Sequence, residues 1–397
     1  MSLVTPQIEQ YIQTQSWIRR MFEAAAELKA KHGAEHVFDF SLGNPDVPPP
    51  PQVGERLREI AAGVSQPLSL GYSPNAGFPS VREAVAEQVS NEQNMPLSAQ
   101  HVIITSGAAG ALNTIFRATL QSQDNVVCYA PYFVEYGFYA ANHGGRLKAV
   151  KSKPLTFEID IAALSEAIDP RTRAMIINSP NNPSGVVYTQ EELDAVADVL
   201  RKKSNEFGKP ILLISDEPYR FLTYDGTVVP PILPTYEHSI VVSSFSKSLS
   251  MAGERIGYIA VNPKMDGVEM LVNGMILANR ILGFVNAPVI GQQVIKKALK
   301  SGVDVTIYEK RRQAMADILD MVGLEYSKPR GAFYFFPKTP KGMDDKKFVD
   351  LLMSENIIAV PGTGFGYPGY FRLTFCVDQS IIQNSEPAWL KVMEKAR

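Results

Sequence analysis

The 397-residue sequence has few cysteines, little net charge and no long apolar run, and each of these features argues against a class of protein. Its two cysteines, Cys128 and Cys376, lie far apart and outside any Cys-x-x-Cys pattern. We therefore expect no disulfide framework and no cysteine zinc site, and a reducing cytoplasm as the location. The net charge is only -2, from 39 Lys and Arg against 41 Asp and Glu, which argues against a nucleic-acid binder that relies on bulk electrostatics.

Membrane and metal signals are also missing from the sequence. No uninterrupted run of about 18 apolar residues occurs, and the first residues have no basic segment followed by an apolar one, so we expect neither a membrane span nor a secretory signal. The five histidines are scattered, and only His32 and His36 are four residues apart. We interpret that pair as solvated residues at a helix end, and we predict no metal site.

What the sequence does contain is an ordinary globular balance and a repeated alternation of strands and helices. Hydrophobic residues make up 45% and charged residues 20%, and the length predicts two to three domains. Short, continuously apolar runs are separated by helical patterns, which is typical of a mostly parallel sheet covered on both faces. The predicted strands are 101–105, 125–129, 174–178, 211–215, 240–244 and 257–261, and the predicted helices between them are 109–120 and 190–203.

The pattern divides the chain into three regions. Residues 1–48 hold an amphipathic helix over 17–31 and a segment that packs with the small domain, 49–288 form the large domain, and 289–397 form a smaller α+β domain. The small domain is expected to begin with one long helix over 291–319 and to contain strand-like segments at 332–336 and 370–377. The helix over 17–31 presents on one face Ile18, Met21, Phe22, Ala25 and Leu28. Four prolines at 48–51 predict an extended connector.

Polar residues follow the predicted strands, and ligands bind at the carboxyl ends of such strands in open parallel sheets. The residues concerned are Ser106, Gly107, Ala108 and Ala109 at a helix start, Phe133, Asn182, Asp216, Tyr219, Ser244, Ser246 and Lys247. Together they suit one anionic, aromatic, carbonyl-bearing cofactor. The backbone N–H groups of the helix start could hold a phosphate, Lys247 could form a Schiff base, and Asp216 could pair with a protonated pyridine nitrogen.

Each of these residues also has an ordinary structural interpretation. A small-residue helix start can simply pack against a sheet, and Lys247 can be a surface lysine. Asp216 can be a helix cap or part of a structural ion pair, and Phe133 can be a core residue. The residues alone leave both interpretations open at every position.

Five segments resemble motifs of the class I/II pyridoxal-phosphate-dependent aminotransferases, in the right order over about residues 35–377. Ser244-Phe-Ser-Lys-Ser-Leu-Ser-Met-Ala-Gly-Glu-Arg-Ile-Gly257 resembles the family's segment around the cofactor lysine. The other four are Gly71-Tyr-Ser-Pro-Asn-Ala-Gly77, Asn182-Pro-Ser-Gly185, Asp216-Glu-Pro-Tyr219 and Phe371-Arg-Leu373. The resemblance implies fold type I, an α/β architecture: a large domain with a mostly parallel seven-stranded sheet flanked by helices, and a smaller α+β domain.

The resemblance also implies roles for individual residues. Lys247 is expected to hold pyridoxal 5′-phosphate and then to shuttle a proton, and Asp216 to pair with the ring nitrogen. Asn182 and Tyr219 are expected to hydrogen-bond the ring oxygen, and Phe133 to stack on the ring. The residues expected to hold the phosphate are Gly107, Ala108, Ala109, Ser244 and Arg255, with Tyr72 from the other subunit of a homodimer, and Ser246 is expected to bind the cofactor as well. Arg372 is expected to bind the substrate α-carboxylate, Gly43 to lie over that carboxylate, and Asn182 to contribute to substrate binding.

The predicted function is the exchange of an amino group between an L-amino acid and a 2-oxo acid by a ping-pong mechanism. β-Lyases, amino-acid decarboxylases and cyclopropane-forming synthases share the same motifs and remain alternatives, as does a non-catalytic domain that only binds the cofactor. A nicotinamide-binding protein is disfavoured because residues 107–110 lack the Gly-x-Gly-x-x-Gly spacing. Substrate choice stays open: Arg280 could bind a distal carboxylate, and Tyr11, Trp17 and Ile18 could line an apolar side-chain pocket.

Overall fold

The computed structural model describes residues 3–13 and 17–396, which form two compact units. The large unit holds residues 45–305 and 330–332, and the small unit holds 306–329, 333–396 and the described part of 1–44. The sequence-based boundary after residue 288 therefore differs from the observed division. The helix α11 (Val289–Ala298) belongs to the large unit because it packs on α3 (Pro51–Ala62) and α4 (Pro79–Gln93).

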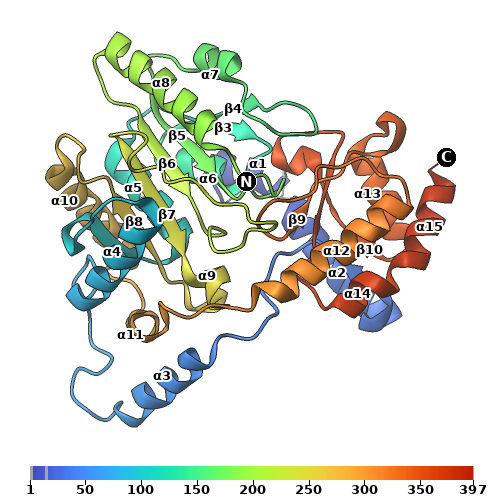
Figure 1. Cartoon of the computed structure of the whole chain (residues 1–397), viewed down its shortest axis with the longest axis horizontal. Coiled ribbons are helices and arrows are strands. Elements are labelled where there is room, and N and C mark those ends of the chain that lie inside the picture. The colour runs from blue at the N-terminus through green and yellow to red at the C-terminus, as the bar shows by residue number, and fades with distance from the viewer. Residues whose placement is uncertain (1–2, 14–16, 397) are drawn as a thin grey trace. The chain divides into compact units, whose positions relative to one another are not determined.

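The large unit is built on one seven-stranded sheet with the strand order β2-β8-β7-β6-β5-β3-β4 (Figure 1). Only β8 runs antiparallel to its neighbours, so the fold is α/β with a mostly parallel sheet, as the sequence predicts. The strands are β2 (Val102–Thr105), β3 (Asn125–Ala130), β4 (Arg146–Lys151), β5 (Thr172–Asn178), β6 (Leu212–Asp216), β7 (Ser239–Ser244) and β8 (Gly257–Val261). The remaining helices are α5 (Gly107–Thr119), α6 (Glu135–Ala141), α7 (Ile161–Ala167), α8 (Gln190–Phe207), α9 (Phe245–Ser248) and α10 (Val268–Asn279).

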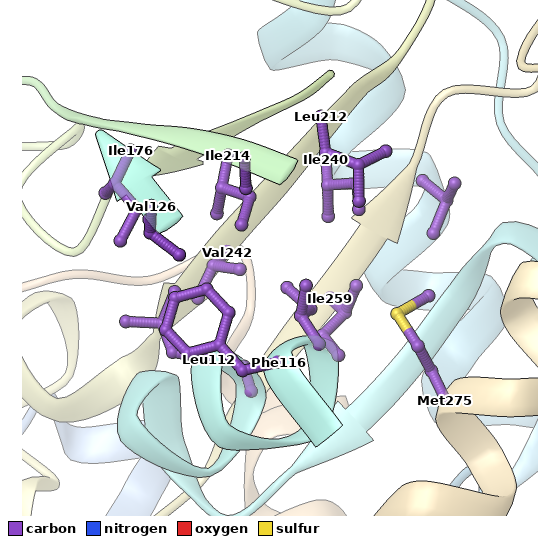
Figure 2. Close-up of a cluster of buried hydrophobic side chains, with 14 of the residues drawn as sticks. Leu112, Phe116, Val126, Ile176, Leu212, Ile214, Ile240, Val242, Ile259 and Met275 are labelled. Carbon is purple, nitrogen blue, oxygen red and sulfur yellow. The ribbon is translucent and has the colours of Figure 1, made fainter. Parts of the chain in front are cut away.

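Alternate side chains of the strands fill the core between the sheet and the helices α5, α6 and α10. Figure 2 shows Val126, Ile176 and Ile214 of the strands gathered with Leu112 and Phe116 of α5 in one apolar layer. The residues between them in the strands, such as Val127 and Met175, are equally inaccessible to solvent, so the sheet is covered on both faces. Burial on both faces explains why the middle residues of these strands form continuous apolar runs.

Local signals in the sequence set several helix ends. The helix α8 begins with a capping box in which the Thr189 side chain accepts from the backbone N–H of Glu192 and the Glu192 carboxylate accepts from that of Thr189. It ends at Gly208, which has the left-handed backbone that favours glycine. The four prolines do not form one extended connector, because Pro51 is the first residue of α3, where a missing N–H costs nothing.

The small unit collects segments from both ends of the chain. Its elements are α1 (Pro6–Gln13), α2 (Trp17–His32), β1 (Phe38–Asp39), α12 (Val305–Met321, whose first residue belongs to the large unit), β9 (Tyr334–Phe335), α13 (Asp345–Ser354), β10 (Ile357–Ile358), β11 (Val360–Pro361), β12 (Phe371–Thr374), α14 (Gln379–Asn384) and α15 (Glu386–Lys395). The strand β12 lies between β11 and β9, and β1 pairs with β10.

Two expectations for the helices are wrong in part. The predicted helix 291–319 is two helices, because the chain leaves α11 at Leu299 and Val303 donates its backbone N–H to the carbonyl of Ser248 at the end of α9. The helix over 17–31 exists as α2 with Met21 and Ala25 buried, but Phe22 is exposed; the side chain of Ile18 lies outside the described residues. None of the helices in the described part combines the length and apolar character that a bilayer span requires.

Candidate active site

The strand ends of the large unit bring the predicted cofactor residues to one edge of the sheet. The neighbouring parallel strands β5, β6 and β7 end at Asn178, Asp216 and Ser244, and Asn178 pairs in register with Asp216. Ser244 pairs with Gly257 of β8, and Gly257 also pairs with the end of β2, directly before α5. The helix start at 107–109 therefore lies at the same edge as Asp216 and Ser244.

The carboxylate of Asp216 is buried, and only one of its two oxygens accepts a hydrogen bond from the described residues. Its side chain is 5% exposed, and Oδ2 accepts a hydrogen bond of 2.5 Å from the Tyr136 hydroxyl. Its other oxygen, Oδ1, is buried and has no hydrogen-bond partner within residues 3–13 and 17–396. Burial raises the pKa of Asp216 to about 7, although the hydrogen bond from Tyr136 lowers that pKa and the neighbouring Glu217 raises it. A buried carboxylate oxygen with no donor is the chemistry that a protonated ring nitrogen would satisfy.

The tyrosine that binds Asp216 also contacts the predicted stacking residue, Phe133. Tyr136 lies on α6, and its ring meets that of Phe133 edge to face, with centroids 5.6 Å apart and an angle of 85° between the planes. Phe133 is half-buried and packs against the core of the sheet. The predicted stacking residue thus lies next to the residue that donates to Asp216.

Hydrogen bonds connect the loop of Asn182 to the end of β6. Asn178 donates its amide N–H to the backbone carbonyl of Asp216 at 2.8 Å, and its Oδ1 accepts from the backbone N–H of Asn182 at 2.7 Å. Asn182 and Tyr219 are both buried, at 6% and 5% exposure. Asn178 therefore fixes the distance between two of the predicted cofactor residues.

The turn after β6 is held by a buried ion pair. Glu217 is 3% exposed, and its carboxylate accepts from the Arg220 guanidinium at 2.9 Å and from the Ser215 hydroxyl at 2.7 Å. Because Asp216 and Tyr219 flank Glu217 in the sequence, this pair holds both at the end of the strand.

A cradle for an anion is formed by the start of α5 and the side chain of Arg255. Gly107 has a φ of +69°, and a Cβ built on it would lie 2.8 Å from Nη2 of Arg255, so only glycine lets the guanidinium approach this closely. Ser106, the residue before the helix, makes no side-chain capping hydrogen bond, so it leaves the first N–H groups of a 13-residue helix to another acceptor. Arg255 itself is exposed. Backbone N–H groups beside a guanidinium fit a phosphate.

Lys247 lies in the short helix α9 directly after β7. Ser244 and Ser246 are buried at 6% and 8% exposure, whereas Lys247 is only partly buried. Lys247 is thus three residues beyond Ser244, the last residue of β7, and β7 lies next to β6, which carries Asp216.

The predicted carboxylate-binding residue lies in the core of the small unit. Arg372 of β12 is 2% exposed, and its guanidinium carbon is 4.7 Å from the ring centre of Tyr334 and 4.8 Å from that of Phe365. Its Nη2 donates to the backbone carbonyl of Ser41. Two aromatic rings and a carbonyl fix the plane of the guanidinium, which a bidentate contact with a carboxylate requires.

Gly43 adjoins the same aromatic residues. A Cβ on Gly43 would lie 2.1 Å from the hydroxyl of Tyr334 and 2.7 Å from the ring of Phe333, so no larger residue fits without moving them. The segment 38–44 is held there because Phe40 donates its backbone N–H to Ile358 and accepts from Thr374. Gly43 and Arg372 therefore share one neighbour, Tyr334.

Two predicted residues lie outside these groups. Tyr72 is 90% exposed and lines a hollow of about 650 Å³ together with Leu70, Glu254 and Phe284. Arg280, at the end of α10, is exposed as well. Sequence reasoning missed Tyr136 and the linking role of Asn178. The signal that could have identified Tyr136 is its position three residues after Phe133. Aromatic residues near a strand end are, however, more often part of the hydrophobic core.

The comparisons with known proteins agree on one family. The chain matches the family model described as aminotransferase class I and II over residues 35–384. It is 32% identical to the probable aspartate/prephenate aminotransferase of Aquifex aeolicus, over 89% of this chain and 90% of the relative. It is 29% identical to the aspartate/prephenate aminotransferase of Thermus thermophilus, over 94% and 95%. A crystal structure of an amino transferase from Eubacterium rectale superposes with a TM-score of 0.95 at 38% identity, covering all of both chains.

Proposed function

This chain belongs to the class I and II aminotransferase family and is an aminotransferase; from that premise we propose that it exchanges an amino group between an L-amino acid and a 2-oxo acid by a ping-pong mechanism, with pyridoxal 5′-phosphate at the strand ends of the large unit. The observation that carries the proposal is the buried Oδ1 of Asp216, which receives no hydrogen bond from the described residues and lies at the strand edge that also carries the anion cradle.

The residues at this edge fit the cofactor. Lys247 would hold it covalently through Nζ, and Oδ1 of Asp216 would accept from its ring nitrogen. Asn182 and Tyr219 would bind the ring oxygen, and Phe133 would face the ring. Its phosphate would be held by Gly107, Ala108, Ala109, Ser244 and Arg255, and Ser246 would line the same site.

The chemistry divides between cofactor and protein. When bound, the cofactor supplies a protonated pyridine ring that takes up the electron pair released when an amino acid loses its α-proton. Lys247 carries that proton, because its Nζ is a free amine once it no longer holds the cofactor covalently. Arg372 binds the α-carboxylate and so orients the bond that breaks. Asp216 supplies the negative charge that keeps the proton on the ring nitrogen.

A panel of amino donors tests this function directly. Purified, cofactor-loaded protein is incubated with single L-amino acids, starting with aspartate and the aromatic amino acids, and with 2-oxoglutarate or pyruvate as acceptor. We expect the oxo acid of the donor and the amino acid of the acceptor in equal amounts, without ammonia or CO₂. Release of ammonia would indicate a β-lyase, release of CO₂ a decarboxylase, and no turnover with any donor a domain that only binds the cofactor.

Arg372→Lys is expected to raise KM for the amino donor by roughly 10- to 100-fold, with a smaller change in kcat. A lysine keeps the charge but loses the planar fork between Tyr334 and Phe365 and so loses the bidentate contact. Steady-state kinetics at several donor concentrations measure the change. Arg312→Lys, at another buried arginine of the small unit with 4% exposure, is the matched control for the cost of the substitution to folding. An unchanged KM in Arg372→Lys would remove the carboxylate-binding role.

We further propose that the protein is a homodimer in which Tyr72 serves the partner's site. Tyr72, Leu68 and Leu70 are 90%, 90% and 50% exposed, and the hollow beside Tyr72 is lined by Phe284, Val285 and other apolar residues. Exposed apolar residues gathered around a hollow favour an interface between proteins. Sedimentation velocity of the loaded protein measures the mass.

A reducing compartment such as the cytoplasm suits the two buried, free cysteines.

A further inference from the structure

We propose that Gln292 is a positioning residue for the cofactor site of the other subunit: it fixes the segment 73–78, and with it the adjacent Tyr72, to the segment 285–287. The inference rests on the proposed homodimer, in which Tyr72 serves the partner's site. None of the segments that resemble the aminotransferase motifs includes Gln292.

The side-chain amide of Gln292, in α11, is fully buried, and both of its polar atoms are hydrogen-bonded. Its Oε1 accepts from the backbone N–H of Phe78 at 2.8 Å. Its Nε2 donates to the hydroxyl of Ser73 and to the backbone carbonyl of Ala287, both at 2.9 Å. A backbone N–H only donates and a carbonyl only accepts, so these partners fix the direction of the amide. One side chain therefore holds both ends of the segment 73–78.

Two asparagines link the same segments a second time. Asn75 donates its side-chain N–H to the backbone carbonyl of Val285 at 2.6 Å, across 210 positions of sequence. Asn279, which is fully buried at the end of α10, donates to the backbone carbonyl of Asn75 at 3.1 Å. Val285 has a φ of +63°, which is costly for a β-branched residue, so its segment needs contacts from outside to keep this conformation.

Tyr72 is the residue directly before the anchored segment. Ser73 is 6% exposed, whereas Tyr72 is 90% exposed. An exposed side chain keeps several rotamers, so the reach of its hydroxyl is decided by the backbone that carries it. To serve the other subunit, this hydroxyl has to come within about 3 Å of a phosphate oxygen. A segment that is fixed in advance avoids the entropy cost of ordering it when the cofactor binds.

The linked segments also adjoin the surface that we assign to the dimer interface. The hollow of about 650 Å³ is lined by Leu70 and Tyr72, which precede the first segment, and by residues 283–286, which lead into the second. Because the buried amide of Gln292 joins the segments, the two parts of this surface cannot move apart independently. The contact therefore connects α11 of one subunit with the phosphate site of the other.

Gln292→Leu removes the hydrogen bonds and keeps a buried side chain. The matched control is Asn262→Leu, because Asn262 is also fully buried and donates to the carbonyls of Leu233 and Tyr236 at 2.6 and 3.0 Å. It follows β8 at the opposite edge of the sheet from Ser244. Asn75→Ala breaks only the half-buried link to Val285, and it replaces Gln292→Leu in every measurement if the leucine variant does not fold.

The measured quantity is the dissociation constant of pyridoxal 5′-phosphate. Cofactor-free dimers are titrated with it, and the visible absorbance of the cofactor attached to Lys247 reports binding. We expect Gln292→Leu to raise the dissociation constant by about 10-fold, as the loss of a hydrogen bond to a charged group does. Asn262→Leu should bind the cofactor like the wild type, although the thermal midpoints of both leucine variants fall.

Hybrid dimers separate an effect on the partner from an effect within the subunit. Two differently tagged chains are co-expressed and purified over both tags, and one of them carries Lys247→Ala, so that only the other attaches the cofactor covalently. In the first hybrid, the chain that keeps Lys247 carries Gln292→Leu and receives Tyr72 from an intact partner. In the second hybrid, a wild-type chain is paired with a chain that carries both substitutions.

We expect the first hybrid to bind the cofactor like the wild type and the second to show the full loss of the Gln292→Leu dimer. A purely structural role within the subunit predicts the reverse. That reverse result, or a Gln292→Leu dimer with the wild-type dissociation constant, would overturn the inference. Tyr72→Phe tests the proposed function separately and should give the same pattern in both hybrids. If Tyr72→Phe binds the cofactor like the wild type, or the loaded protein sediments as a monomer, the proposed role of Tyr72 fails, and that of Gln292 fails with it.

Discussion

Replacing Lys247 by alanine is expected to lower kcat by about 10⁴-fold or more, because the variant loses both the covalent attachment and the proton carrier of the reaction. Lys247 follows the strand end of β7, in a short helix that begins at buried residues, so its backbone is held at the strand edge. Lys151 and Lys153 also lie at or after a strand end, but their strand β4 is separated from β6 by β5 and β3, whereas Lys247 follows the strand next to that of Asp216. Lysine elsewhere on the surface therefore cannot replace it.

The assignment of Lys247 is checked by two measurements. Borohydride treatment of the loaded wild type should fix the cofactor on the peptide that contains Lys247, and mass spectrometry of the digest locates it. Lys264→Ala removes an exposed lysine of the same unit and should keep wild-type kcat and the same labelled peptide. An adduct on a different lysine, or a Lys247→Ala variant within tenfold of the wild-type rate, would contradict the assignment.

The sheet and its ligand-binding edge could be predicted because both are indicated by residues that are close together in the sequence. Strands buried on both faces contain continuous apolar runs, so 125–129 and 174–178 can be recognised, and the residues that follow such strands are expected at the ligand-binding edge. The strand β4 could not be recognised in this way. It lies at the edge of the sheet, and three basic residues, Arg146, Lys148 and Lys151, interrupt its apolar pattern.

The contacts that join distant segments could not be predicted. The break between α11 and α12 depends on Val303 binding the carbonyl of Ser248, more than 50 residues away, while the helical pattern runs on through the break. The hydroxyl of Tyr136 meets Asp216 across 80 positions of sequence, in a stretch of five aromatic residues over 132–139 of which each could be core. Sequence patterns identify which residues are buried, but the donor that reaches a given carboxylate depends on the packing.

Asp216→Asn is expected to abolish most of the activity. In the cofactor-free protein it is also expected to remove the loss of stability that the wild type undergoes as the pH rises. The folded protein holds this carboxyl with a pKa of about 7, whereas an unfolded chain has the ordinary value of about 3.9. Between these values the folded state binds a proton that the unfolded state has lost, so the free energy of unfolding falls as the pH rises from about 4 to about 7. A difference of three pH units corresponds to about 4 kcal/mol.

Asparagine has nearly the same shape and cannot ionise, so the variant escapes this loss. The difference in the free energy of unfolding between Asp216→Asn and wild type should grow by about 4 kcal/mol in favour of the variant between pH 4 and pH 8, as measured by urea unfolding of the cofactor-free proteins. Asp169→Asn is a control of opposite sign. Although burial raises the pKa of Asp169, hydrogen bonds from the Arg171 backbone and Lys148 lower it more, so its carboxylate stabilises the folded state above pH 4. If the curves for Asp216→Asn and wild type run parallel over this range, Asp216 does not carry the buried charge that the cofactor's ring nitrogen is proposed to neutralise. The same comparison on loaded proteins should show a flatter wild-type curve, because the bound ring supplies the missing partner of Oδ1.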